Sequence, residues 1–186
     1  MGHAPALHWP AELLLRAQGM RLLLLDVDGV LTDGGLYYGE SGEVMKRFHT
    51  LDGHGLKLLA RAGLQVGVIS GRDSPALRQR LAALGIQHAR LGTEDKLPAA
   101  QALLQELGIA WAHTAAMGDD WPDLPLLRHA GFACAPAQAH AEVRALATHV
   151  TTLAGGSGAV RELCDLLLAA GGHYRRLLEQ HLGPAP

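Results

Sequence analysis

The chain contains few of the residues that mark several large classes of protein. Only two cysteines, Cys134 and Cys164, occur in 186 residues, and they lack the CxxC spacing of zinc and redox sites. Both lie in apolar stretches, so we expect core thiols and not a disulfide framework. Aromatic residues make up 4% of the chain, which argues against stacking on single-stranded nucleic acid.

Net charge and long apolar runs are also lacking. The formal net charge of −2 favours neither nucleic acid nor an anionic membrane as a partner. No apolar run approaches the length of a membrane span. The apolar residues 13–15 are followed by Arg16, Gln18 and Arg21, which leaves no uninterrupted signal-peptide core. We therefore expect a soluble, cytoplasmic protein that binds neither nucleic acid nor membrane.

Apolar residues are plentiful, in contrast. They make up 48% of the chain against 18% for charged residues, the balance of a folded globular protein. A chain of this length can form one domain with a sizeable core. Because we find no internal repeat and no low-complexity linker, we predict a single domain over residues 1–186.

The most informative stretch is a run of four leucines, residues 22–25, followed directly by Asp26 and Asp28. Such a short apolar run is typical of a central parallel strand that is covered on both faces. Gly29 allows a sharp turn, so the two carboxylates can share one site. Carboxylates held this close repel each other, and a hard cation such as Mg²⁺ relieves the repulsion. The alternative is that both acids are merely solvated in a loop.

Strand and helix patterns alternate along most of the chain. Strands are predicted at residues 22–25, 64–69, 89–91, 114–117, 132–134 and 149–152. Helices are predicted at residues 11–18, 51–61, 75–84, 93–107, 122–129, 139–146 and from 159 onward. This alternation predicts an α/β fold with a doubly wound parallel sheet. Residues 171–186 are assigned to a C-terminal tail.

One segment, residues 35–48, interrupts the alternation. Two runs of aromatic or β-branched residues flank a glycine-containing turn at residues 40–43, which is typical of a β-hairpin. We expect the hairpin to project from the domain, where it would serve as a lid or in assembly. Its apolar side chains are too many for both faces of an exposed two-stranded ribbon, which favours self-association.

Polar residues follow several of the predicted strands at the same edge of the sheet. They are Asp26 with Asp28, Ser70 with Gly71, Lys96 at the start of a helix, and Asp119 with Asp120. Each has an ordinary alternative, because a serine can simply end a strand, a lysine can be solvated and an aspartate can cap a helix. Ligands of α/β proteins bind at the carboxyl ends of the strands, so the joint placement of these residues favours a functional site.

At these positions the sequence resembles the haloacid dehalogenase superfamily of phosphotransferases. The resemblance extends from residue 22 to about residue 168. The motifs that carry it are Asp26-Val27-Asp28-Gly29-Val30, Ser70, Lys96 and Gly118-Asp119-Asp120 with Asp123. It implies a phosphate-monoester hydrolase that works through an aspartyl-phosphate intermediate.

The resemblance also implies roles for the acidic residues. Asp26 is the expected nucleophile, and Asp28 is expected to protonate the leaving alcohol and then to activate water. The expected ligands of Mg²⁺ are the Asp26 carboxylate, the Asp28 backbone carbonyl and Asp119. Asp120 and Asp123 are expected to support the site.

For the remaining motif residues, the resemblance implies contacts with phosphate. Ser70 and the Gly71 N–H are expected to bind phosphate oxygens. Lys96 is expected to neutralise charge on the phosphate and on the nucleophile.

Within the superfamily, the chain resembles the small capless group that hydrolyses 3-deoxy-D-manno-octulosonate 8-phosphate (Kdo 8-phosphate) during lipopolysaccharide precursor synthesis. Residues 26–34, 48–55, 70–72 and 155–162 carry this resemblance. It implies a homotetramer assembled through the hairpin, with a neighbouring subunit over each active site. The substrate-binding residues that it implies are Asp28, His49, Thr50, Leu51, Asp52, Gly53, Lys57, Gly71, Arg72, Arg80 and Lys96.

Some substrate positions depart from the pattern of this group and leave the sugar preference open. His49 stands where asparagine is usual, and Leu51 and Lys57 stand where arginine is usual. Arg72 favours Kdo 8-phosphate, because the sister phosphatases of nine-carbon sugar-acid phosphates tend to have glutamate there. A guanidinium group suits a sugar carboxylate, which a glutamate would repel.

Three alternatives remain open at this point. The first is a sister phosphatase that acts on a nine-carbon sugar-acid 9-phosphate. The second is a receiver-type signalling domain, in which the phosphoacceptor aspartate ends the third strand instead of the first. The third is a catalytically silent binding or assembly partner, against which the intact pair Asp26 and Asp28 argues.

Overall fold

Strand β1, Leu22–Leu25, lies in the middle of a six-stranded parallel sheet in the computed structural model, which describes residues 6–40 and 42–183. The strand order is β5-β4-β1-β6-β7-β8. The other strands of this sheet are β4 (Gln65–Ser70), β5 (His88–Leu91), β6 (Thr114–Met117), β7 (Phe132–Ala135) and β8 (His149–Val150). Leu25 is level with Val68 of β4 and Met117 of β6, so the carboxyl ends of these three strands lie at one edge of the sheet.

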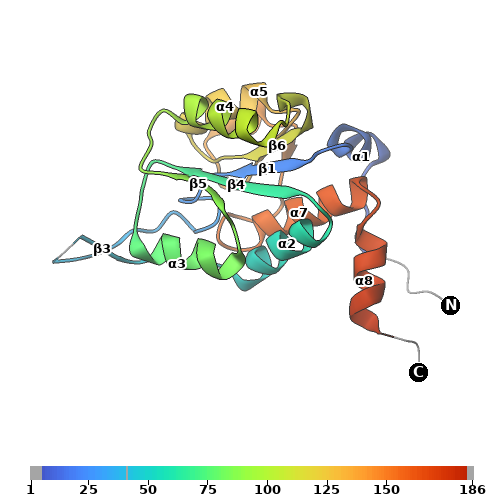
Figure 1. Ribbon diagram of the computed structural model, residues 1–186, viewed down its shortest axis with the longest axis horizontal. Coiled ribbons are helices and arrows are strands. Elements are labelled where there is room, and N and C mark those ends of the chain that lie inside the picture. The colour runs from blue at the N-terminus through green and yellow to red at the C-terminus, as the bar shows by residue number, and fades with distance from the viewer. Residues whose placement is uncertain (1–5, 41, 184–186) are drawn as a thin grey trace.

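Helices cover both faces of the sheet (Figure 1). The layer below it in Figure 1 contains α2 (Thr50–Arg61), α3 (Pro75–Leu84) and α7 (Ala159–Ala170), and α1 (Ala11–Ala17) packs against α7. The other layer contains α4 (Lys96–Leu107), α5 (Leu124–His129) and α6 (Ala141–Leu146). Each layer of helices encloses a hydrophobic core against the sheet, and we call the one on the side of α2 and α7 the first core. Leu23 and Leu25 pack into the first core, and Leu22 and Leu24 pack into the second. Because both faces of β1 are buried, an unbroken leucine run fits there. The predicted doubly wound fold is confirmed.

Outside the sheet, strands β2 (Tyr37–Gly39) and β3 (Gly42–Met45) form an antiparallel hairpin. The hairpin extends away from the domain at the left of Figure 1. Its large apolar side chains are 40–63% exposed. These residues are Leu36, Tyr37, Tyr38, Val44 and Met45. The expected projecting hairpin is therefore present, and its use in assembly stays a prediction.

The segment that the sequence left as a tail contains a helix. Helix α8, Tyr174–Leu182, buries Leu177 in the first core, and Arg61 donates a hydrogen bond of 3.0 Å to Gln180. The sequence also predicted strand β8 two residues too long. Thr152 donates its backbone N–H to the Glu162 carboxylate at the start of α7, and this contact replaces the sheet pairing expected there.

Cys134 and Cys164 are both free and buried, as expected. Burial raises the pKa of both thiols well above the ordinary range, which makes them unreactive core residues. Within the described residues, the structure contains no helix that combines the length and the apolarity of a membrane span.

Candidate active site

The carboxyl ends of β1, β4 and β6 and the first turn of α4 surround one cavity of about 510 Å³. The lining residues include all four catalytic candidates and most of the predicted acidic residues. They are Asp26, Asp28, Gly34, Leu36, Ser70, Gly71, Arg72, Glu94, Lys96, Asp119, Asp120, Pro122 and Asp123. A larger cavity of about 590 Å³ involves the loops that precede β1 and β4, and no carboxylate lines it. The chemistry therefore points to the smaller cavity.

Lys96 joins two of the carboxylates. Its Nζ lies 2.8 Å from Asp26 Oδ1 and 2.6 Å from Asp123 Oδ1, and all three side chains are largely buried. Burial by itself lowers the pKa of Lys96, but the charges of Asp26 and Asp123 outweigh burial and raise it. The lysine is therefore a fixed positive charge beside the carboxylate that ends β1.

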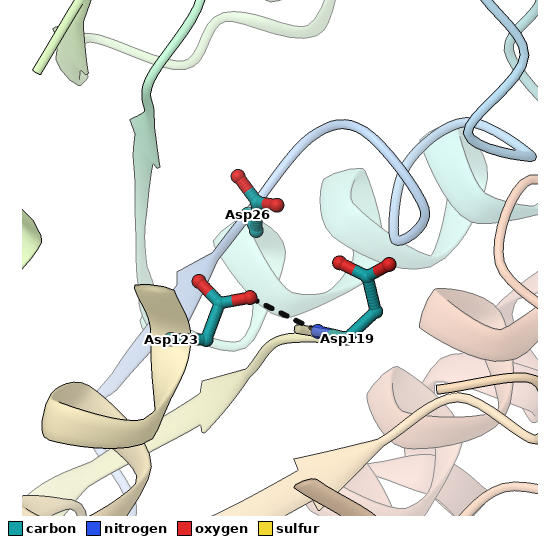
Figure 2. Close-up of side chains that lie close together, drawn as sticks. All are labelled: Asp26, Asp119 and Asp123. Atoms are coloured by element: carbon teal, nitrogen blue, oxygen red, sulfur yellow. Dashed lines mark hydrogen bonds between the residues drawn. The ribbon is translucent and has the colours of Figure 1, made fainter. Parts of the chain in front are cut away.

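Asp119 completes an acidic cluster with Asp26 and Asp123 (Figure 2). Ligand atoms of the three carboxylates lie within 4.8 Å of one another. The two oxygens of Asp123 are already engaged, because Oδ1 contacts Lys96 and Oδ2 accepts the backbone N–H of Asp119 at 3.0 Å. Asp26 and Asp119 are therefore the side chains placed to hold a cation, and Asp123 holds them in position.

Two glycines make this crowding possible. A Cβ atom on Gly29, which has φ +83°, would lie 2.0 Å from Asp119 Oδ2. A Cβ atom on Gly118 would lie 2.2 Å from the Cβ of Asp123. Larger residues at either position would push the carboxylates apart.

The electrostatics of the cluster favour a divalent cation. Burial, with the charge of Asp123, raises the pKa of Asp26 to about 6 although Lys96 opposes the shift. Burial, with the charges of Asp26 and Asp123, raises the pKa of Asp119 to about 7. Three carboxylates and one ammonium sum to two negative charges when all are ionised, and hard oxygen ligands are those that Mg²⁺ prefers. The residues present therefore fit the predicted ion.

Ser70 and its neighbours form the opposite wall. The Ser70 side chain is buried and its Oγ accepts the Arg72 backbone N–H at 3.2 Å. This bond bends the chain after β4 around the cavity, so that Ser70, Gly71 and Arg72 all line it. Arg72 also reaches the hairpin, where it donates a hydrogen bond of 3.2 Å to the Tyr38 hydroxyl.

A partner of Asp28 was missed by the sequence analysis. Lys46, directly after β3, places Nζ 2.5 Å from Asp28 Oδ1 and 3.1 Å from Glu43 Oε1. The Glu43 contact is an ion pair without hydrogen-bond geometry. Lys46 stands in no recognised motif, and the contact depends on how the hairpin folds back, so sequence spacing gave no sign of it.

Comparison with known proteins identifies the family. Residues 92–163 match a family model described as haloacid dehalogenase-like hydrolase. The 3-deoxy-D-manno-octulosonate 8-phosphate phosphatase KdsC of Escherichia coli K12 is 44% identical over 162 residues, which cover 87% of this chain and 86% of that protein. This chain belongs to the KdsC family.

Solved structures agree with this assignment. A Moraxella catarrhalis 3-deoxy-D-manno-octulosonate 8-phosphate phosphatase, in complex with magnesium, phosphate and Kdo, is 38% identical with a TM-score of 0.88. The match covers 91% of this chain and 98% of that one. The cobalt-bound Haemophilus influenzae enzyme is 43% identical with a TM-score of 0.84, over 86% and 93% of the two chains.

Not every predicted substrate residue of this KdsC family member lines the cavity of its own chain. Seven of them lie on α2, directly before it or on α3, outside the lining described above. They are His49, Thr50, Leu51, Asp52, Gly53, Lys57 and Arg80. Arg80 donates a hydrogen bond to the His49 carbonyl at 3.2 Å. Asp52 is 1% exposed and accepts the Arg161 backbone N–H at 2.8 Å, so its burial does not support direct substrate contact.

The metal site generates a first prediction. Asp119→Ala removes one of the two carboxylates placed to hold the cation, so Mg²⁺ affinity should fall by more than the roughly 10–100-fold typical of residues that only orient a ligand. Isothermal titration calorimetry measures this change. Asp73→Ala is the matched control, because Asp73 pairs with Arg78 on the surface. Equal Mg²⁺ affinity in wild type and Asp119→Ala would place the ion elsewhere.

A second prediction concerns the stability of the metal-free protein. Because folding raises the pKa of Asp119 from 3.8 to about 7, the folded state binds protons more tightly than the unfolded state. This stabilising effect is complete below pH 3.8 and is lost as the pH rises through 7. The free energy of unfolding of wild type, relative to Asp119→Asn, should therefore decrease between pH 5 and pH 8. Urea denaturation with a chelator tests this, and a difference that stays constant or grows would contradict it.

Proposed function

We propose that this chain is a Mg²⁺-dependent phosphatase that converts Kdo 8-phosphate to Kdo and inorganic phosphate in lipopolysaccharide precursor synthesis. The observation that carries the proposal is the meeting of Asp26, Lys96, Ser70 and Asp119 in one cavity. Membership of the KdsC family supports it, because the curated relatives are Kdo 8-phosphate phosphatases. The Moraxella catarrhalis relative binds magnesium together with phosphate and Kdo, the two products of such a reaction.

The covalent step is assigned to Asp26. Its carboxylate attacks phosphorus, the bond from phosphorus to the sugar oxygen breaks, and an aspartyl-phosphate forms. Lys96 contacts Asp26 and offsets the repulsion between this carboxylate and the phosphate. The Ser70 hydroxyl and the Gly71 N–H bind phosphate oxygens. When bound, Mg²⁺ held by Asp26, the Asp28 carbonyl and Asp119 supplies the positive charge that the three carboxylates require.

Proton transfer is assigned to Asp28. It gives a proton to the sugar oxygen as that oxygen leaves, and later takes a proton from the water that attacks the aspartyl-phosphate. Asp120 and Asp123 support the proposed metal site. They form a capping box at residues 120–123, which fixes the loop that bears Asp119.

Arg72 supports the choice of a sugar acid as substrate. Its side chain is 47% exposed, and its Nε lies 3.7 Å from Asp28 Oδ2, beside the proposed reaction centre. A planar guanidinium group binds a carboxylate through two hydrogen bonds. The alternative substrate, a nine-carbon sugar-acid 9-phosphate, would meet the same group, so a substrate panel distinguishes the two.

The substrate residues outside the cavity suggest that a second subunit completes the site. We assign His49, Thr50, Leu51, Lys57 and Arg80 to the cavity of a neighbour in a homotetramer formed through the hairpins. Asp52 and Gly53 are buried, and Asp52 holds this segment in position by accepting the Arg161 backbone N–H. The exposed apolar side chains of the hairpin support the assembly. A cytoplasmic location stays a prediction, supported by two free, buried thiols.

The nucleophile assignment predicts that Asp26→Asn lowers turnover by at least about 10⁴-fold, as in other enzymes that lose a nucleophile. Phosphate release is measured over a panel of sugar phosphates, with and without Mg²⁺. Wild type should prefer Kdo 8-phosphate and require the metal. Mg²⁺-dependent turnover by folded Asp26→Asn would refute the assignment, and preference for a nine-carbon substrate would change the named substrate.

The assembly is tested by changing both Tyr37 and Val44 to Lys. Two charges on the exposed hairpin should dissociate the tetramer, because burial of each large side chain contributes roughly 1.5–3 kcal/mol to association. Light scattering gives the mass of each species. Leu15→Lys is the control, since Leu15 is 70% exposed on α1, away from the hairpin. A wild type that is monomeric at micromolar concentration and fully active would exclude the assembly.

A further inference from the structure

Lys46 is one of two lysines that the structure buries beside a carboxylate of the site. Its side chain is 1% exposed, and its ammonium group contacts Asp28 and Glu43. The chain has only three lysines, and the second buried one is Lys96. A long, strongly hydrated side chain is costly to bury, so a buried position needs close charged partners. The Asp28 contact at 2.5 Å provides one.

This contact gives the two oxygens of Asp28 different surroundings. Oδ1 faces Lys46 at the base of the hairpin, whereas Oδ2 lies 3.7 Å from Arg72 Nε on the cavity wall. A carboxylate fixed by a charge-assisted hydrogen bond on one oxygen has little freedom to rotate. The Lys46 contact therefore fixes which oxygen of Asp28 faces the cavity.

Each of the two buried lysines contacts one of the two proposed catalytic carboxylates. Lys96, on α4, contacts the proposed nucleophile Asp26. Lys46 contacts the proposed acid Asp28 and comes from the hairpin, which lies outside the six-stranded sheet. Helix α4 thus fixes the Asp26 carboxylate, and the hairpin fixes the Asp28 carboxylate.

We propose that Lys46 is a positioning residue that directs Asp28 Oδ2 at the leaving oxygen of the substrate. This inference rests on the proposed function. In the step that Lys46 supports, the phosphorus–oxygen bond breaks and the proton moves from Asp28 to the alcohol oxygen. Lys46 keeps its three protons throughout and touches neither the phosphate nor the sugar.

The test uses two substrates that differ in their need for an acid. The sugar oxygen of a sugar phosphate must be protonated in order to leave, whereas 4-nitrophenolate leaves without a proton. Comparison of kcat/KM is suitable, because it reports the steps up to phosphoryl transfer and not the later hydrolysis shared by both substrates. Since general acid catalysis contributes about 10²–10⁴-fold, Lys46→Met should lower kcat/KM for Kdo 8-phosphate by about 100-fold. For 4-nitrophenyl phosphate the expected loss is less than about fivefold.

Three further variants separate positioning from a structural role. Lys46→Arg keeps the charge and should retain a ratio of the two kcat/KM values close to that of wild type. Arg47→Met removes the adjacent basic residue, which is exposed and pairs with Asp33, and should leave the ratio unchanged. In an Asp28→Asn background, Lys46→Met should cause no further loss on the sugar phosphate. If Lys46→Met does not fold, Lys46→Gln is measured with the same expectation.

Mg²⁺ affinity, thermal stability and mass by light scattering are measured for each variant. Equal losses on both substrates, or no loss on either, would overturn the proposal. If wild type hydrolyses other sugar phosphates but not Kdo 8-phosphate, the assignment of Kdo 8-phosphate as the substrate is wrong. The ratio is then measured with the alkyl phosphate that wild type prefers, and it still tests Lys46.

Discussion

The site depends on an excess of negative charge at the point where β1 and β6 end. Asp26, Asp119 and Asp123 lie within one small cluster, and the Lys96 ammonium offsets one of their charges. Burial raises the pKa of Asp26 and of Asp119, and the neighbouring carboxylates raise both further. The remaining negative charge accounts for the fit to Mg²⁺, since a divalent cation balances the cluster and stabilises the ionised carboxylates. The packing around β1 is strong enough to hold these groups together, because all four of its leucines are buried.

A second feature is the separate support of the two proposed catalytic carboxylates. Asp26 follows a buried strand, and its backbone N–H donates to the Met117 carbonyl of β6. Asp28 lies beyond the strand, and its carboxylate pairs with a lysine of the hairpin. The position of Asp28 therefore depends on how the hairpin sits, whereas that of Asp26 depends on the sheet. If the hairpin also joins subunits, as we propose, then assembly and the placement of Asp28 are linked through one segment.

Sequence patterns were sufficient for the parts that depend on local chemistry. The leucine run predicted β1. The residues at the ends of β1, β4 and β6 and at the start of α4 were predicted to meet at one edge of the sheet, and they line one cavity. The pairing of Lys46 with Asp28 could not be predicted, because it links residues 18 apart through the path of the hairpin. The role of Asp123 in engaging both Lys96 and the loop of Asp119 depends on the 3-10 helix at Trp121–Asp123, which spacing does not encode. Helix α8 was missed because its nine residues include only a short apolar stripe. The helix is stabilised by the packing of Leu177 on the core.

If Asp26 carries the phosphoryl group during turnover, the aspartyl-phosphate can be trapped on this residue. Wild-type protein is quenched with acid during the first turnover, and borohydride then reduces an aspartyl-phosphate to homoserine. Cleavage with trypsin after Arg21 and Lys46 isolates residues 22–46, a peptide that contains three aspartates for mass spectrometry to distinguish. We expect homoserine at position 26, with Asp28 and Asp33 unchanged. Homoserine at another aspartate, or an unmodified peptide from protein that turns over, would contradict this role of Asp26.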